Sequence, residues 1–423
     1  MNRTVPAEGG KPAEFRHGWP ALLAATVGCA MGLSSLPFYS LGSFIAPLQA
    51  EFGWGRGDVA SSFLYTTVVL ALVSPLLGGL IDRVGVRPVA LVSIPLLAAV
   101  LFAISRFEGS VTGFHLLYAL AGLVGSGATP INYTRAVNAA FDRGRGLALG
   151  ISLAGIGVAA FALPPLLAWI IQAHGWRTAY LTLAVLALLP WPFALLGLRE
   201  GEAARSAVLR DGASVAFALR SGTFWVIGLG FAAIAVAVSA LVVHITPLLR
   251  DAGLDAMAAA RIASVIGIGV LGGRILAGYV IDRFFAPFVA AAMFLATALG
   301  CLLLLLGGPA LAPVAAVLVG LSLGAEVDLI AYLTARYFGM ARYGFLYALI
   351  YAMFAVGAAV GPAAAGTLFD LTGSYTVPLW CVIALLAVSS LAIAALPRFD
   401  AFTRRWQGAD TAAGLPAAQP SVL

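Results

Sequence analysis

Long apolar segments alternate with short polar segments along almost the whole chain. A helix that crosses the bilayer core needs about 20 mostly apolar residues. By this rule the sequence predicts membrane-spanning helices at residues 19–41, 59–81, 88–105, 114–138, 147–171, 178–198, 222–246, 258–281, 287–307, 312–336, 344–368 and 378–396. The expected fold class is therefore an all-α integral membrane protein with twelve transmembrane helices.

The twelve predicted spans fall into two sets of six that repeat in the same orientation. Asp82-Arg83 follows the second span and Asp282-Arg283 follows the eighth, at an offset that also relates Gly53 to Gly253. Such a repeat predicts two six-helix halves related by a pseudo-twofold axis, with a substrate site at the seam between them. The expected boundaries are an N-terminal tail at 1–18, a first half at 19–198, a linker at 199–221, a second half at 222–396 and a C-terminal tail at 397–423.

The composition supports a lipid-solvated protein. With 61% hydrophobic and 10% charged residues, the chain has too few charges to cover a water-soluble globule. Most basic residues fall in segments that are cytoplasmic if the N-terminus is inside, which predicts cytoplasmic termini in a bacterial inner membrane. This placement explains the net charge of +6 without nucleic acid as a partner. The cysteines lie in apolar runs without metal-ligand spacing, so neither a metal nor another cofactor is expected.

The loop after the second span carries a motif of known type. Gly78-x-Leu80-Ile81-Asp82-Arg83-x-Gly85-x-Arg87, with its degenerate copy at Gly278 to Arg283, resembles the signature of the major facilitator superfamily. Further segments are similar to the branch of monocarboxylate porters and oxalate/formate antiporters: Phe141 to Gly150, Gly272-Gly273-Arg274 and Gly357-x-x-x-Gly361-Pro362. The resemblance implies a secondary transporter that works by alternating access.

Two departures from these relatives narrow the expected substrate. Animal-type monocarboxylate porters carry an aspartate one helical turn before the arginine of the eighth span, where this chain has Val270. Oxalate exchangers pair that arginine with a lysine in the eleventh span, whereas Leu346 to Phe354 contains no cation. A dicarboxylate would require two positive partners, so a singly charged anion is favoured over oxalate.

Charges at the predicted cytoplasmic helix ends are candidates for a gate. The carboxylate of Asp82 can accept hydrogen bonds at a helix N-terminus, and neighbouring arginines can pair across the half. The flanking glycines allow close helix approach. The alternative is that these charges only set the topology. The expected gating residues are Asp82, Arg83, Arg87, Asp282, Arg283, Arg135, Arg143 and Arg145, although Arg135 alternatively snorkels to the interface.

Arg274 is the predicted substrate anchor. It lies eight residues before Asp282, so at 1.5 Å per residue it is about 12 Å from the cytoplasmic helix end. A guanidinium at this depth costs about 3 kcal/mol or more unless it meets water or an anion. It stays charged, and its planar fork matches a carboxylate. The alternative is a permanent ion pair with Glu326 or Asp328.

Glu326 and Asp328 are the carboxylates of the predicted span cores, and their two-residue spacing points them to different helix faces. A carboxyl group in such a low-dielectric setting can carry a proton at physiological pH. We expect Asp328 to pair with Arg274 and Glu326 to be the proton site, with the reverse assignment left open. A neutral, hydrogen-bonded carboxyl group without a transport role is the alternative.

Several further side chains are weaker candidates. His244, near the outer end of the seventh span, can relay protons, although packing explains a histidine at a helix end equally well. Asn132, Tyr133, Tyr332 and Tyr351 are possible hydrogen-bond donors to the substrate, with helix packing or interface roles as alternatives.

The sequence thus predicts that a small organic anion, most simply a monocarboxylate, moves with protons through a monomer embedded in membrane lipid. Proton-coupled efflux of drugs or metabolites and carboxylate exchange are the alternative transport functions. An enzyme is not expected, because no nucleophile and base lie together near the predicted site.

Overall fold

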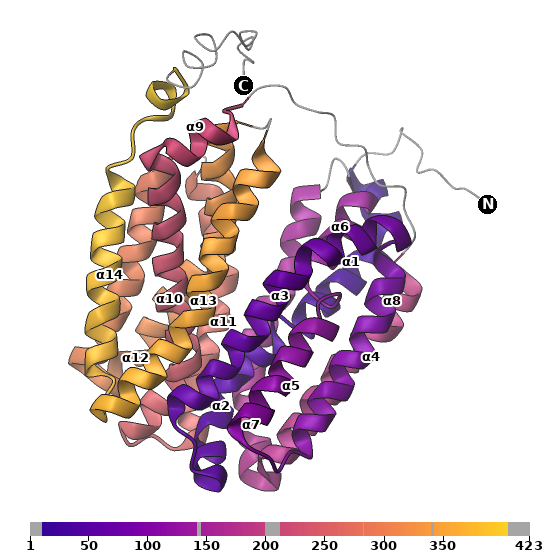
Figure 1. Ribbon diagram of the computed structural model, residues 1–423, viewed down its shortest axis with the longest axis vertical. Coiled ribbons are helices and arrows are strands. Elements are labelled where there is room, and N and C mark those ends of the chain that lie inside the picture. Colours follow the sequence, from indigo (N-terminus) through magenta and orange to yellow (C-terminus); the bar gives the residue numbers. More distant parts are fainter. Residues whose placement is uncertain (1–10, 142–144, 199–211, 282, 340–341, 405–423) are drawn as a thin grey trace. The chain divides into compact units, whose positions relative to one another are not determined.

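The computed structural model describes residues 11–141, 145–198, 212–281, 283–339 and 342–404. In this part of the chain the regular structure is helical, and Figure 1 shows the course of the helices. The helices are α1 (Lys11–Ala30), α2 (Leu36–Phe52), α3 (Arg56–Val84), α4 (Val86–Ser105), α5 (Val111–Val124), α6 (Pro130–Ala140), α7 (Arg145–Leu188), α8 (Pro190–Gly197), α9 (Val215–Arg220), α10 (Gly222–Asp251), α11 (Ala256–Ile281), α12 (Ala286–Phe338), α13 (Tyr343–Thr372) and α14 (Thr376–Ala394).

Eight helical segments among the described residues are long and apolar enough to cross a membrane. Two of these segments are long enough to contain two successive spans each. Gly175 (φ 82°) interrupts α7, and Gly308 (φ 49°) interrupts α12. A left-handed backbone conformation at these positions favours glycine, which has no Cβ to clash. The eight segments therefore account for ten of the expected spans, and α1–α2 and α5–α6 supply the other two.

The first and fourth spans are broken helices, which the hydrophobic pattern alone did not predict. The chain leaves helical geometry at residues 31–35 and again at 125–129. These two interruptions meet, because the Leu33 amide donates to the Ala128 carbonyl oxygen at 3.0 Å. The Ser35 hydroxyl donates to the Cys29 carbonyl oxygen at 2.6 Å. The Leu33–Ala128 bond gives each interruption a hydrogen-bond partner for one of its backbone groups. Backbone groups in a bilayer interior need such partners because hydrocarbon offers none.

The chain forms two compact units. The first unit comprises Met1–Ala204, Val242–Ile268 and Pro362–Gly373, and the second comprises Arg205–Leu241, Gly269–Gly361 and Ser374–Leu423. Helices α10, α11 and α13 therefore each contribute one end to the first unit. We call this end of the first unit, where α2 ends and α3 begins, the Arg56 end.

A polar and aromatic cluster joins the C-terminal end of α2 to the second part of α7 at the Arg56 end. Glu51 accepts a hydrogen bond from the Trp176 indole nitrogen at 2.6 Å and forms an ion pair with Arg177 at 2.7 Å. Phe52 stacks on Trp54 at 4.5 Å between ring centroids and also contacts Trp176. The hydrogen bonds from Arg177 and Trp176 lower the pKa of Glu51 below its usual value.

The lowered pKa of Glu51 predicts a pH-dependent contribution to stability. The contribution is complete above the pKa of the unfolded chain, about 4.3, and is lost as the pH falls through the lower folded-state pKa. Glu51→Gln is therefore expected to lower the melting temperature of the detergent-solubilised protein modestly at pH 7, and the difference from the parent is expected to shrink under strongly acidic conditions. Thermal unfolding at several pH values tests this, and a pH-independent difference would contradict it.

Candidate functional site

Small residues bring α11 and α12 together around Arg274. A Cβ at Gly273 would collide with the Leu321 carbonyl oxygen, and one at Gly324 would collide with the Val270 carbonyl oxygen. A Cβ at Gly269 would likewise meet α12 near Gly320. The repeated four-residue spacing of glycine on both helices allows this close crossing. The crossing places the Arg274 side chain of α11 beside the acidic segment of α12.

Arg274 and Asp328 form a loose ion pair in the second unit. The Arg274 Nη1 lies 3.8 Å from the Asp328 Oδ2, and the two side chains are 16% and 43% exposed. The Arg274 Nε is buried and has no hydrogen-bond partner among the described residues. One long contact leaves donors of the guanidinium available, since the group carries five N–H bonds. The geometry combines a mostly buried cation with an anion that solvent or a ligand can reach.

Glu326 lies close by on the same helix, in a different environment. The residue is 2% exposed, and neither carboxyl oxygen has a hydrogen-bond partner among the described residues. An ionised carboxylate buried without a partner costs several kcal/mol, whereas a neutral carboxylic acid largely avoids this cost. The two carboxyl groups therefore differ: among the described residues, Asp328 contacts a cation and Glu326 does not.

A row of tyrosines on α13 lies near these carboxyl groups. The rings of Tyr343, Tyr347 and Tyr351 stack in sequence, with centroids 5.6 and 5.8 Å apart. Tyr347 lies within electrostatic range of Asp328, and Tyr351 within range of Glu326. Tyr351 is 38% exposed. The second unit thus presents phenol groups beside the cation and the two acids.

The other predicted substrate ligands have different surroundings. Asn132 of α6 is buried in the first unit, where its amide nitrogen donates to the carbonyl oxygens of Val86 and Gly127. The Tyr133 hydroxyl is also buried there and has no hydrogen-bond partner among the described residues. Tyr332, in the second unit, packs edge-on to Phe399. Their roles in binding stay predictions.

The predicted gating residues are described only in part. Arg83 is exposed and Arg87 half-buried, and Arg135 on α6 is half-buried. Arg283 lies over the Tyr279 ring at 3.6 Å and donates to its carbonyl oxygen. The remaining four positions, or their side chains, lie outside the described residues: Asp82, Arg143, Arg145 and Asp282.

Glycines on α13 and α7 differ in how closely another helix packs against them. Gly357 and Gly361 pack α13 against the backbone of α10 at Ala232 and Val236. At Gly150 of α7, by contrast, no atom of the described residues outside the local helix backbone lies within 4 Å of the place a Cβ would take.

His244 has a packing partner at the Arg56 end. Its ring is buried, and Nε2 lies 2.8 Å from the Pro362 carbonyl oxygen. Because a carbonyl oxygen can only accept, Nε2 carries the proton in this contact. The bond joins α10 to α13, and the relay role of His244 stays a prediction.

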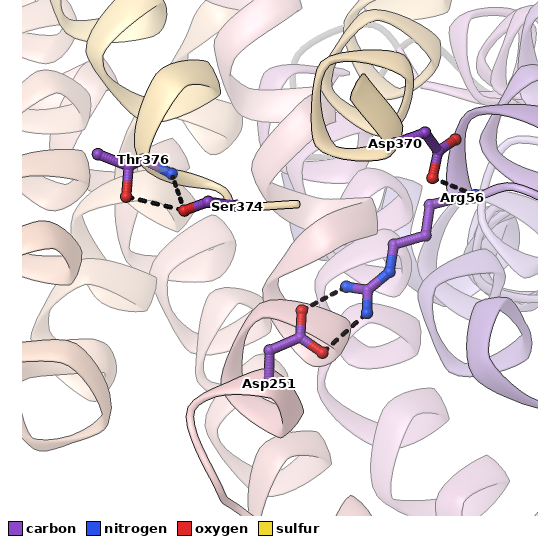
Figure 2. Close-up of polar contacts among 5 residues, drawn as sticks. All are labelled: Arg56, Asp251, Asp370, Ser374 and Thr376. Carbon is purple, nitrogen blue, oxygen red and sulfur yellow. Dashed lines mark hydrogen bonds and ion pairs between the residues drawn. The ribbon is translucent and has the colours of Figure 1, made fainter. Parts of the chain in front are cut away.

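A polar cluster at the Arg56 end was not predicted from the sequence. The guanidinium of Arg56 binds Asp251 through two hydrogen bonds of 2.6 and 2.8 Å (Figure 2). Asp370 accepts hydrogen bonds from the backbone amides of Arg56 at 3.0 Å and Gly57 at 2.8 Å. Arg56 also lies over the Phe369 ring at 3.9 Å. We call Arg56, Asp251 and Asp370 the Arg56 clamp.

The repeat offset contained a signal for this cluster. Glu51 and Asp251 occupy equivalent positions, each two residues before a glycine with positive φ, Gly53 and Gly253. Both are carboxylates near the end of the helix that precedes this glycine, Glu51 in α2 and Asp251 in α10. A comparison of charged residues at equivalent positions would have marked Asp251 before the structure was known, although its partner would have stayed unknown.

Comparison with known proteins agrees with this architecture. Residues 27–325 match the family model described as Major Facilitator Superfamily. The chain belongs to this superfamily. It is 29% identical to monocarboxylate transporter 13 of Bos taurus over 408 residues, covering 95% of this chain and 93% of that protein. It is 28% identical to the oxalate:formate antiporter of Oxalobacter formigenes over 241 residues, covering 55% and 54% of the two chains.

The solved structures include a mutant of the nucleoside transporter NupG, which matches with a TM-score of 0.73 at 13% identity and covers 89% of this chain and 99% of that chain. This likeness confirms the fold. The major facilitator protein is a multi-pass membrane transporter, and the expectation that it is not an enzyme is confirmed by its family and relatives.

Proposed function

We propose that this major facilitator protein carries a small monocarboxylate together with a proton, by alternating access, across a bacterial inner membrane with both termini in the cytoplasm. The observation that carries the proposal is the environment of Arg274. Its guanidinium is mostly buried, has one ion-pair contact at 3.8 Å and keeps a buried Nε without a partner among the described residues. A carboxylate fits the donors that this loose pair leaves available.

A single anchor favours a singly charged substrate. Asp328 already offsets part of the positive charge of Arg274, so a second carboxylate on the substrate would need another cation. The α13 segment near the acids offers tyrosine hydroxyls instead. In the proposed binding step, the substrate carboxylate accepts hydrogen bonds from the guanidinium of Arg274. The phenol of Tyr347 or Tyr351 donates a further hydrogen bond.

Glu326 is the proposed proton site. When the proton is lost, its carboxylate would be buried without a partner, which is unfavourable in this environment. Loss of the proton therefore requires a conformation in which the group meets water or a cation. This requirement would link the protonation state to the conformational change, as a proton-coupled carrier needs. The relatives named as a monocarboxylate transporter and an oxalate:formate antiporter support an organic anion as the cargo.

Uptake into liposomes tests the proposal. With a more acidic medium outside, liposomes that contain the purified protein are expected to accumulate labelled lactate, by up to about tenfold for each unit of pH difference, since one pH unit and a tenfold concentration ratio both correspond to about 1.4 kcal/mol. Protein-free liposomes measure passive leakage of the acid. Accumulation of oxalate but not lactate would contradict the single-anchor proposal, and uptake that requires internal carboxylate but ignores the pH gradient would replace symport with exchange.

A further inference from the structure

The two repeats use equivalent carboxylates in different ways. Glu51 of the first repeat binds Trp176 and Arg177, which follow Gly175 in that same repeat. In the second repeat the equivalent glycine with positive φ is Gly373, and the next two residues are Ser374 and Tyr375. Ser374 bonds to Thr376 at the start of α14 (Figure 2).

Asp251 therefore has no arginine at the position equivalent to Arg177, and it binds Arg56 of the first repeat, 195 residues away. A contact within one repeat can persist while the repeats move, because its partners move together. A contact from one repeat to the other must change when they move relative to each other. The Arg56–Asp251 pair is of the second kind, and Glu51–Arg177 is of the first.

Asp370 gives the cluster a second contact between the repeats. Its carboxylate lies at the N-terminus of α3 and accepts from the first two amides of that helix. Such amides lack partners within their own helix, and the helix dipole favours a negative charge there. The C-terminal end of α13 thus caps α3 from a distant part of the chain. The carboxylates of Asp251 and Asp370 are exposed, so water can solvate them when these contacts break, whereas the Arg56 side chain is only 13% exposed in this conformation.

Helix α3 is packed very differently at its two ends. At the Arg56 end, a Cβ at Gly366 of α13 would collide with the Cα of Gly57, so the two backbones touch. At the other end, no atom of the described residues outside the local α3 backbone lies within 4 Å of where a Cβ of Gly78 or Gly79 would stand. A glycine inside a helix costs about 1 kcal/mol relative to alanine, and no contact among the described residues requires it at either position in this conformation.

We propose that the Arg56 clamp is a gate, which holds α3, α10 and α13 together at the Arg56 end in this conformation and opens when the protein converts to its alternate conformation. Gly78 and Gly79 would then provide the close helix contact that this conformation leaves unused. The proposal rests on the alternating-access transport proposed above, and it adds the residues that stabilise one of the two states.

Cysteine labelling tests the gate without any substrate. Ser43 of α2 lines a small cavity with Gly42 and Thr246 in the first unit. Ser43→Cys would be introduced into a Cys381→Ser background, because Cys381 is exposed whereas the other two cysteines are buried. In liposomes, Asp251→Asn or Arg56→Gln is expected to raise the rate of labelling by a membrane-impermeant maleimide about fivefold, as loss of a charge-assisted pair shifts the population toward the open state.

Glu51→Gln is the matched control. It removes a carboxylate at the equivalent position, but its partner lies in the same repeat, so the labelling rate is expected to stay within about twofold of the parent. The double variant Arg56→Gln/Asp251→Asn should label no faster than either single variant, because both changes remove the same bond. Unchanged labelling in folded Asp251→Asn protein would overturn the gate, and so would an equal increase in Glu51→Gln. Because labelling needs no transported anion, these outcomes are independent of the lactate experiment.

Discussion

Arg274→Gln is expected to reduce the initial rate of lactate uptake by about 100-fold or more. Truncation of one partner in a buried charged contact costs on the order of 2–5 kcal/mol, and glutamine keeps a polar end group but has no charge and a shorter side chain. Arg274→Lys is expected to give an intermediate rate, since lysine keeps the charge but loses the planar fork. Initial rates in liposomes measure the effect, with size-exclusion profiles to verify that each variant is folded.

A paired variant separates binding from structural ion pairing. Arg274→Gln leaves Asp328 without its cation, which by itself could destabilise the helix bundle. Arg274→Gln/Asp328→Asn removes both charges, so it should recover the melting temperature of the parent while lactate uptake stays low. If the double variant instead recovers uptake, the ion pair serves only the structure and the anchor is wrong. A rate within twofold of the parent in Arg274→Gln alone would contradict the anchor directly.

Glu326→Gln is expected to remove the response of lactate accumulation to a pH gradient, with a loss of at least about tenfold. Glutamine imitates the neutral, protonated carboxyl group but cannot release a proton, so the coupling step would be lost while the protein retains its packing. Exchange of labelled for unlabelled lactate at equal pH should continue, because it needs no net proton movement. Both quantities can be measured in the same liposome preparation.

Asp328→Asn is the comparison variant for this prediction. It changes a carboxyl group two residues away on the same helix, but one that contacts Arg274 at 3.8 Å and is 43% exposed. We expect Asp328→Asn to change the concentration dependence of lactate uptake. The response of accumulation to the pH gradient should stay unchanged. The opposite pattern in the two variants would assign the proton to Asp328. A normal response in both would exclude α12 as the proton site.

Much of the architecture follows from local sequence. A run of about 20 apolar residues has few alternatives to a membrane-spanning helix, because hydrocarbon offers the backbone no hydrogen-bond partners. The breaks at residues 31–35 and 125–129 were not predicted, because their few glycine, serine and threonine residues interrupt the apolar runs only briefly. They are stabilised by contacts with each other, such as Leu33 to Ala128, and a single segment does not reveal such a contact.

For the candidate site, too, some features follow from the sequence and others only from the tertiary structure. The sequence by itself determined that Arg274 is a charge inside an apolar helix and that Glu326 and Asp328 share another helix, because these facts depend only on position and helical rise. Tertiary structure decided which acid contacts the arginine, since the crossing of α11 and α12 through their glycines sets the distance. Only the tertiary structure revealed the Arg56 clamp, because Asp251 and Asp370 lie 195 and 314 positions from Arg56 in the sequence. Ion pairs form between neighbours in space, and no hydrophobic periodicity encodes which distant charge becomes a neighbour.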